Sequence, residues 1–154
     1  MSRWFSATPF WTWIVVAAIT GGVLGLGGYT FLYADGGSYL SDDPSACVNC
    51  HVMRDVYDGW HNGTHKAVAA CNDCHTPHHF PDKYVVKGIN GWNHSVAFTT
   101  GAFHEPIRIT GLNRTVALEN CLYCHGDLVV AMGHEATDDP TDCLRCHEGV
   151  GHGK

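Results

Sequence analysis

The sequence predicts a small, mainly α-helical protein: one N-terminal transmembrane helix, then a domain of short helices and loops. Three observations support this fold class. An uncharged apolar stretch lies near the N-terminus, long apolar periodic segments are scarce after it, and all eight cysteines fall into four copies of Cys-x-x-Cys-His. A domain with so few apolar runs cannot bury a large side-chain core of its own.

The first element is the apolar stretch. No charged residue occurs from residue 4 to residue 34, and residues 14–33 alone would extend about 30 Å as a helix, which matches the hydrocarbon thickness of a bilayer. Aromatic residues lie at both of its ends, as in interfacial belts. A cleaved signal peptide is the alternative, but Tyr33-Ala34-Asp35 is a poor small-x-small cleavage site. We therefore expect an uncleaved transmembrane anchor at residues 10–34.

The charges that flank this anchor differ in sign. Arg3 precedes it, whereas acidic residues follow it at Asp35, Asp42 and Asp43. Because positive charge favours the cytoplasmic side, we expect residues 1–9 in the cytoplasm and residues 35–154 outside.

The second feature is the repeated Cys-x-x-Cys-His motif, the attachment signature of c-type haem. Two Cys₄ zinc sites built from the same cysteine pairs are the alternative, but a histidine after every pair favours haem. The motif residues are Cys47, Cys50 and His51; Cys71, Cys74 and His75; Cys121, Cys124 and His125; and Cys143, Cys146 and His147. We therefore expect four covalently bound haems c, which form most of the core of a multihaem cytochrome c domain at residues 35–154.

Location and charge agree with this chemistry. Covalent haem attachment takes place on the outer face of the bacterial cytoplasmic membrane, so the predicted orientation delivers every motif to the periplasmic side. The formal net charge of −6 argues against nucleic acid as a partner.

Each haem iron also needs axial ligands, and histidine is plentiful. Eight histidines lie outside the motifs, which favours ligation of several haems by two histidines. The first motif continues to Met53, whose thioether could compete with His51 for the same iron. Spacing alone does not decide between these two ligands.

The extended motifs resemble one known family. They are Cys47-Val-Asn-Cys-His-Val-Met53, Cys71-Asn-Asp-Cys-His-Thr-Pro-His78 and Cys143-Leu-Arg-Cys-His-Glu-Gly-Val-Gly-His152. Together with the anchor, they make the chain similar to the NapC/NirT family of membrane-anchored tetrahaem cytochromes c. The short chain is most similar to the members that act as quinol dehydrogenase subunits of cytochrome c nitrite reductase.

The resemblance implies a set of axial ligands. Met53 would ligate the first haem, His152 the second and His65 the third. The proximal ligands of haems two, three and four would be His75, His125 and His147. For the distal side of the fourth haem, His134, a residue of a partner reductase, and His104 or another histidine stay open.

A quinol site needs a cation beside the developing quinolate and a base for the proton. Lys87 and His94 supply these groups in the central segment, residues 81–94. In the family, a lysine that matches Lys87 lines the menaquinol pocket, and an aspartate seven residues later faces the first haem. His94 stands at that second position, either as a ligand of the first haem or as the proton acceptor.

The central segment mixes apolar and aromatic residues with Lys83 and Lys87. It would lie either on the membrane surface with its lysines snorkelling, or as a half-buried connecting helix.

The resemblance implies that the chain oxidises menaquinol from the membrane pool and relays electrons to an ammonia-forming periplasmic cytochrome c nitrite reductase. A NapC-like relay that serves several reductases is the main alternative; a haem sensor and a reductase in its own right are weaker ones. A Gly21-x-x-x-Gly25 spacing in the anchor permits close helix packing among lipids, which leaves homo-oligomerisation in a larger complex open.

Overall fold

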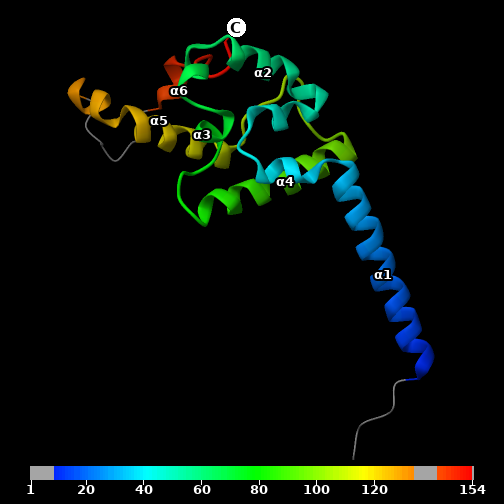
Figure 1. Ribbon diagram of the computed structural model, residues 1–154. Coiled ribbons are helices and arrows are strands. Elements are labelled where there is room, and N and C mark those ends of the chain that lie inside the picture. The colour runs from blue at the N-terminus through cyan, green and yellow to red at the C-terminus, as the bar shows by residue number, and fades with distance from the viewer. Residues whose placement is uncertain (1–8, 134–141, 154) are drawn as a thin grey trace, which may run out of the picture. The chain divides into compact units, whose positions relative to one another are not determined.

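The computed structural model describes residues 9–133 and 142–153, and within these ranges it contains helices and loops but no strand (Figure 1). The α-helices are α1 (Phe10–Tyr33), α2 (Arg54–His61), α3 (Cys71–His75), α4 (Asp82–Thr100), α5 (Gly111–Ala131) and α6 (Cys143–Cys146). Short 3₁₀ helices are η1 (Gly36–Leu40), η2 (Pro44–Asn49), η3 (His51–Met53) and η4 (Thr64–Ala67). The predicted mainly α-helical fold is confirmed.

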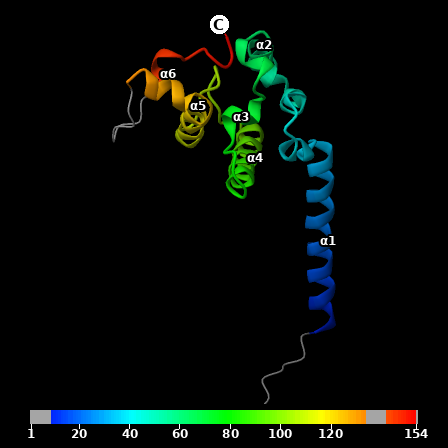
Figure 2. The ribbon, with the colours of Figure 1, turned by 60° about the vertical axis from the view of Figure 1, so that its left-hand side comes forward.

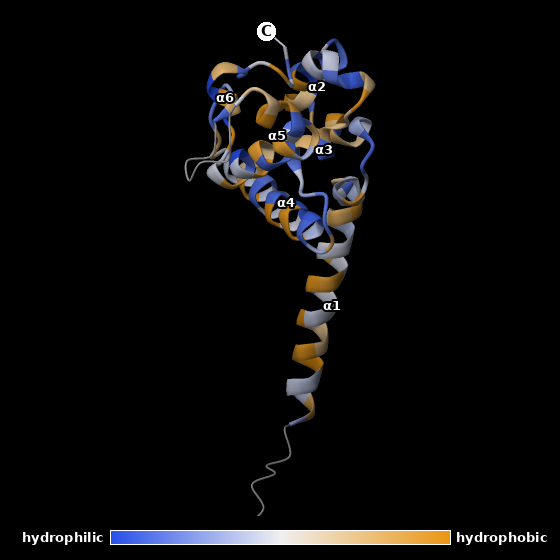
Figure 3. Cartoon of the chain, turned by 90° about the vertical axis from the view of Figure 1, so that its left-hand side faces the viewer, coloured by the Kyte–Doolittle hydropathy of each residue, from blue (hydrophilic) through white to orange (hydrophobic). Residues whose placement is uncertain are grey.

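The chain divides into two units, residues 1–37 and 38–154. The first contains α1, which begins directly after Pro9 and runs for 24 residues, or about 36 Å. None of its residues is buried within the chain, and apolar bands follow its length in Figure 3. It is long and apolar enough to cross a membrane. A Cβ on Gly21 or Gly25 would meet nothing within 4 Å, so this face of the helix is open.

The second unit has a small side-chain core. Among its described residues, the buried apolar side chains are Val86, Val116 and Ala117, and no large side chain is completely buried. This agrees with the expectation that the domain has too few apolar segments to form a large side-chain core by itself. Most of its helices are short and lie at or between the Cys-x-x-Cys-His motifs.

The second, third and fourth motifs lie on helices that pack together. α3 packs against α5, and the two helices lie side by side in Figures 1 and 2. α5 also contacts α6. The buried Asn120 on α5 donates hydrogen bonds to the carbonyl oxygens of Cys74 and Thr76, at 3.1 and 2.9 Å. Arg114, also on α5, forms an ion pair with Asp142, which immediately precedes α6.

α4 connects the two motif pairs. It begins after Pro81 and ends at Gly101, whose φ of 69° is a left-handed C-cap that glycine adopts at no steric cost. Its inner side contacts the segment around Asp42 through Lys83 and Lys87, and α5 through Asn90. The central segment that the sequence leaves open is therefore a long helix packed on one side only.

Candidate functional site

The four motifs adopt related local structures. The second motif is α3 itself, the third lies within α5, and the fourth begins at α6. The first is divided between η2 and η3, and η2 begins where Asp43 accepts a hydrogen bond from the amide of Ser45. In each helical turn the two cysteines are three residues apart and share a face, which suits two thioether bonds to one ring. All eight cysteines are free of disulfides.

The structure brings His75 of the second motif against His152 near the C-terminus. Their ring centres are 5.8 Å apart and the rings are 26° from parallel. Two contacts with α2 hold His152 in place. Its Nδ1 lies 3.3 Å from the carbonyl oxygen of Val56, and its backbone packs so closely on Gly59 that a Cβ there would overlap the His152 carbonyl oxygen. The C-terminal segment is therefore docked rather than frayed.

His125 of the third motif likewise lies against His65, with ring centres 6.2 Å apart and planes at 75°. His65 belongs to η4, in the short connection between α2 and α3. Trp60 of α2 spans this connection, because its indole N–H donates to the carbonyl oxygen of Ala69 at 3.0 Å. That bond fixes the connection on which His65 lies.

Both histidine pairs fit a metal held between two imidazoles. A metal–imidazole bond is about 2 Å long, so two rings whose nitrogens bind opposite sides of one ion have centres roughly 6 Å apart. Burial, and then the nearby charge of His152, lower the pKa of His75, which keeps the imidazole in its neutral, ligating form. Among the described residues, no group of three or more His, Cys, Asp or Glu side chains is arranged to hold a metal ion, so the zinc alternative has no site there.

The first and fourth motifs are less complete. His51 and Met53 share the single turn η3, and the Met53 amide donates to the Cys50 carbonyl at 2.9 Å. The two residues lie two positions apart in the same turn, so the choice of ligand between them remains a prediction. His147 follows α6, and His134, proposed opposite it, lies outside the described residues.

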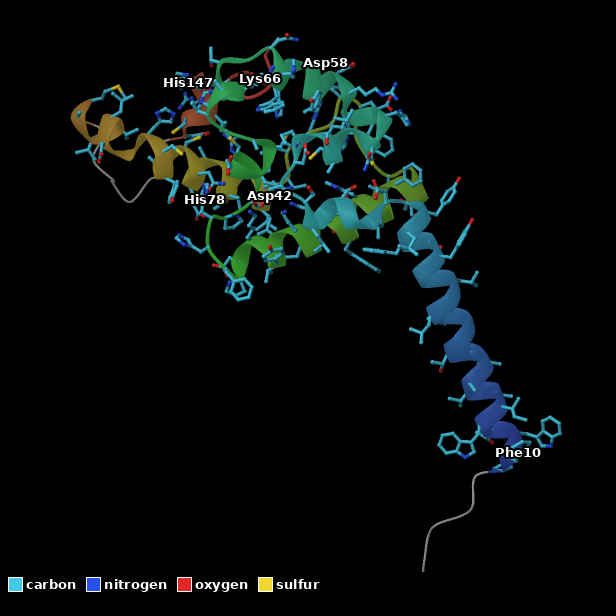
Figure 4. The ribbon with its side chains drawn as sticks, in the orientation of Figure 1. Phe10, Asp42, Asp58, Lys66, His78 and His147 are labelled. Atoms are coloured by element: carbon cyan, nitrogen blue, oxygen red, sulfur yellow. The ribbon has the colours of Figure 1, made fainter. Side chains whose placement is uncertain are left out.

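A cluster of charged side chains surrounds Asp42 on the inner side of α4 (Figure 4). The Lys87 ammonium is 2.7 Å from Asp42 Oδ1 and donates to the Ser41 carbonyl at 2.9 Å, while the Lys83 ammonium is 2.6 Å from Asp42 Oδ2. Asn72 also donates to Asp42, at 3.0 Å. Hydrogen bonds from Lys83 and then Lys87 lower the pKa of Asp42 to about 2. The carboxylate is therefore ionised throughout the physiological range.

One interpretation of the sequence expects Lys87 to snorkel, but in the structure it does not. Its side chain is only 6% exposed, and it is the most buried charged group among the described residues. A buried ammonium needs a partner, because removal from water costs several kcal/mol. Asp42 is that partner. A hydrogen bond with Cys71, and then the charge of Lys87, lower the pKa of the Cys47 thiol. Lys87 thus stands between an acidic residue and the first motif.

His94, about two turns further along α4, is hydrogen-bonded to Tyr39 of η1. The Tyr39 hydroxyl lies 2.8 Å from His94 Nδ1, and the tyrosine ring lies against α4 at Gly91. Burial, and then the neighbouring Cys50 and Cys47, raise the pKa of Tyr39 to about 12, so the phenol keeps its proton. Partial desolvation lowers the pKa of His94. The neutral imidazole is thus the dominant form at neutral pH.

The sequence did not point to Asp42 or Tyr39 as site residues. Asp42 had served only as a charge that sets the orientation of the anchor, and its partners Lys83 and Lys87 are more than 40 residues away in the chain. Tyr39 is 55 residues from His94. No local spacing rule links residues so far apart, so only the packing of η1 and the following loop on α4 reveals them.

The helical fold, the Cys-x-x-Cys-His turns and the histidine pairs together define a multihaem c-type cytochrome. A model of the NapC/NirT cytochrome c family, N-terminal region, matches residues 6–120. The chain belongs to the NapC/NirT cytochrome c family, as its motifs predicted, and its haem is therefore covalently bound haem c.

Two relatives and one solved structure are similar to the chain. The cytochrome c-type protein NrfH of Wolinella succinogenes is 39% identical over 152 residues, which cover 92% of this chain and 84% of that protein. The cytochrome c-type protein NapC of Escherichia coli K12 is 24% identical, with coverages of 90% and 80%. A chain in the crystal structure of the cytochrome c nitrite reductase NrfHA complex bound to the HQNO inhibitor has a TM-score of 0.61 and 30% identity, and the match covers 89% of this chain and 90% of that one.

Family membership and the apolar helix α1 together make the chain a single-pass membrane protein with an electron-transport role. They also fit the site. The inner side of α4 offers a buried cation and a neutral base beside the first motif, while the second and third motifs offer paired imidazoles.

Proposed function

We propose that the chain carries four haems c, one on each motif, and that it oxidises menaquinol and passes the electrons to a cytochrome c nitrite reductase. Residues 1–9 would be cytoplasmic, residues 10–34 would cross the inner membrane, and residues 35–154 would form the periplasmic tetrahaem domain. The similarity to NrfH and to a chain of the HQNO-bound NrfHA complex supports this function over other roles of a c-type cytochrome.

In this proposal the histidine pairs hold the second and third haems. His75 and His152 ligate the second, and His125 and His65 the third, which their ring separations support. Met53 ligates the first haem. His147 ligates the fourth, whose other side is taken either by His134 or by a residue of the partner reductase. The haems supply one-electron transfer from the quinol to the partner.

The burial of Lys87 beside Asp42 is the observation that carries the quinol site. Lys87 donates a hydrogen bond to a quinol oxygen and stabilises the negative charge that forms there as the proton leaves. Asp42 holds the ammonium in that position and keeps it charged. In the tautomer whose Nδ1–H donates to the Tyr39 hydroxyl oxygen, His94 has a free Nε2 that accepts the proton, and we assign it this role instead of ligation.

A relay that serves several reductases is the second candidate function. The 24% identity to NapC over 90% of the chain supports it, although the identity to NrfH is much higher. Binding of a purified cytochrome c nitrite reductase distinguishes the two: a stable complex favours the dedicated subunit, whereas equal electron transfer to several reductases without a stable complex favours the relay.

Rapid anaerobic mixing with a reduced naphthoquinol tests the quinol site directly. Haem absorbance should show fast reduction in the detergent-purified protein, and Lys87→Ala should slow it by about a hundredfold, because a buried donor to the developing charge is lost. Lys83→Ala is the matched control, since Lys83 pairs with the same Asp42 from a more exposed position, and it should slow reduction far less. Equal rates for all three proteins, each fully reducible by dithionite, would reject the site.

A further inference from the structure

α4 carries a row of paired polar side chains on its inner face and a row of exposed apolar side chains on its outer face. On the inner face Lys87 pairs with Asp42, Asn90 exchanges two hydrogen bonds with Asn113 of α5 at 3.0 and 3.1 Å, and His94 pairs with Tyr39. Positions 87, 90 and 94 are three and four residues apart, so they share one side of the helix. Three pairings from one side fix which face of α4 points into the domain.

The outer face is an apolar stripe of four residues. Val85, Ile89, Trp92 and Val96 follow one another at spacings of four, three and four, and are 55%, 41%, 72% and 42% exposed. A surface helix of a water-soluble domain shows the opposite pattern, with its apolar stripe on the core and its polar side in water. Figure 3 shows polar and apolar bands alternating along α4. The stripe is thus an apolar surface that no other part of the described chain covers.

Charge is absent from most of this helix. From Gly88 to His104 the sequence contains no Asp, Glu, Lys or Arg, and the two lysines before it turn inward to Asp42. A protein partner that docks by charge complementarity finds nothing to pair with here. A lipid surface needs none, and tryptophan is favoured at its boundary.

The stripe also differs from the exposed apolar residues of α5. Leu122, Tyr123 and Leu128 lie within or just after the third motif, where they would border the haem that this motif attaches. α4 carries no Cys-x-x-Cys-His motif, and the imidazole of its single histidine is engaged with Tyr39 on the inner side. The stripe of α4 thus lies on a helix that itself attaches no haem.

We propose that the stripe Val85–Ile89–Trp92–Val96 lies in the surface of the lipid bilayer. The domain that begins at Ser38 follows α1 almost directly in the chain, so the anchor keeps it at a membrane. An amphipathic helix in this position buries its apolar face at the boundary between headgroups and acyl chains. Where the proposed quinol oxidation holds, one helix then separates the lipid phase, in which the quinol is dissolved, from Lys87 and His94.

Photolabelling from within the bilayer tests this surface. The full-length, haem-loaded protein is reconstituted in nanodiscs of phosphatidylethanolamine and phosphatidylglycerol that contain a lipid with a diazirine on its acyl chain. After irradiation, peptide mass spectrometry should find adducts on α1 and also on the four stripe residues. Adducts on α1 alone would overturn the proposal, as would crosslinks between the α4 helices of two copies, which would make the stripe a protein interface.

A charged variant sharpens the test. Ile89→Asp combined with Trp92→Asp should reduce the α4 adducts by about tenfold while those on α1 persist, because a carboxylate opposes insertion of the stripe. Val68→Asp, at a residue that is 81% exposed, is the matched control and should change neither. Unchanged haem spectra verify folding, and undiminished α4 adducts in the double variant would reject the stripe. No quinol is present, so this result and the effect of Lys87→Ala are independent.

Discussion

The second and third motifs differ from the first in what lies next to them. His75 and His125 each face another histidine ring, at 5.8 and 6.2 Å between centres. Beside the first motif the structure places Lys87, held by Asp42, and the tyrosine of the Tyr39–His94 pair. The same five-residue sequence pattern therefore occupies two chemically distinct settings in one small domain.

The difference separates conduction from exchange with a substrate. A metal between two imidazoles has no free position, so a centre of that kind can only accept and pass on electrons. A buried ammonium and a hydrogen-bonded imidazole can instead bind a polar oxygen and take its proton. We infer that electrons enter at the first motif and are conducted through the second and third, and the following variants test each side of this division.

The largest expected effect is the loss of a histidine pair. His152→Ala and His65→Ala should each convert one haem from low-spin to high-spin, so that the fraction of the low-spin signal that belongs to that one haem is lost. Electron paramagnetic resonance of the oxidised protein measures this fraction. Loss of the same haem signal in both variants would contradict the assignment, since the two pairs belong to different motifs.

Met53→His should alter the first haem alone. Histidine in place of methionine lowers the reduction potential, so a redox titration should show one haem shifted to lower potential and the other three unchanged. A titration identical to that of the unmodified protein would exclude Met53 as a ligand and leave His51 in that role.

Gly59→Ala should act on the second haem without touching either of its ligands. The added Cβ would overlap the His152 carbonyl oxygen, so the C-terminal segment must shift away from α2 and from His75. The expected result is a partial loss of the low-spin signal that His152→Ala removes completely. Gly151→Ala has open space around its Cβ and serves as the control with an unchanged spectrum.

The sequence was sufficient for the contacts that a motif fixes and insufficient for those that packing fixes. The anchor, the helical domain and the family follow from the uncharged stretch and the Cys-x-x-Cys-His motifs. The family pattern also selected His65 and His152, whose rings lie near those of His125 and His75, and their ligation of haem stays a prediction. Asp42 lies 45 positions from Lys87 in the chain and Tyr39 lies 55 from His94, and Gly59 contacts His152 near the C-terminus. No periodicity or spacing rule reaches that far.

Asp42→Asn should slow reduction by quinol and leave the histidine pairs of the second and third motifs intact. The buried Lys87 ammonium loses its charged partner, so reduction by naphthoquinol should slow by about tenfold, while the low-spin signals remain. Haem reduction in the rapid-mixing experiment measures this effect. An Asp42→Asn rate equal to that of the unmodified protein would mean that Ser41 alone can position Lys87.

The stability difference between the unmodified protein and Asp42→Asn should depend on pH. Because the pKa of Asp42 is lowered from 3.8 to about 2 in the folded protein, its stabilising effect is fully present above about pH 4 and is lost as the pH falls through 2. The carboxylate is 55% exposed, so solvent screening limits this effect to about 1 kcal/mol at most. The difference in melting temperature between the two proteins should therefore be constant from pH 5 to 7 and shrink below pH 4.

Tyr39→Phe should give the smallest effect, because it removes one hydrogen bond and no charge. The phenylalanine ring keeps the contact with Gly91 but leaves His94 Nδ1 without its partner at 2.8 Å, so the imidazole is less well oriented for the quinol proton. We expect a slowing of about threefold to tenfold, the value of one hydrogen bond of about 1 kcal/mol, in a rate that Lys87→Ala lowers much further. The pH profile separates positioning from mere packing: the pKa of the rate should shift in Tyr39→Phe, since the hydroxyl that bonds His94 is gone. A slower rate with an unshifted profile would make Tyr39 a packing residue only. His94→Ala, which removes the base itself, should be reduced more slowly than Tyr39→Phe.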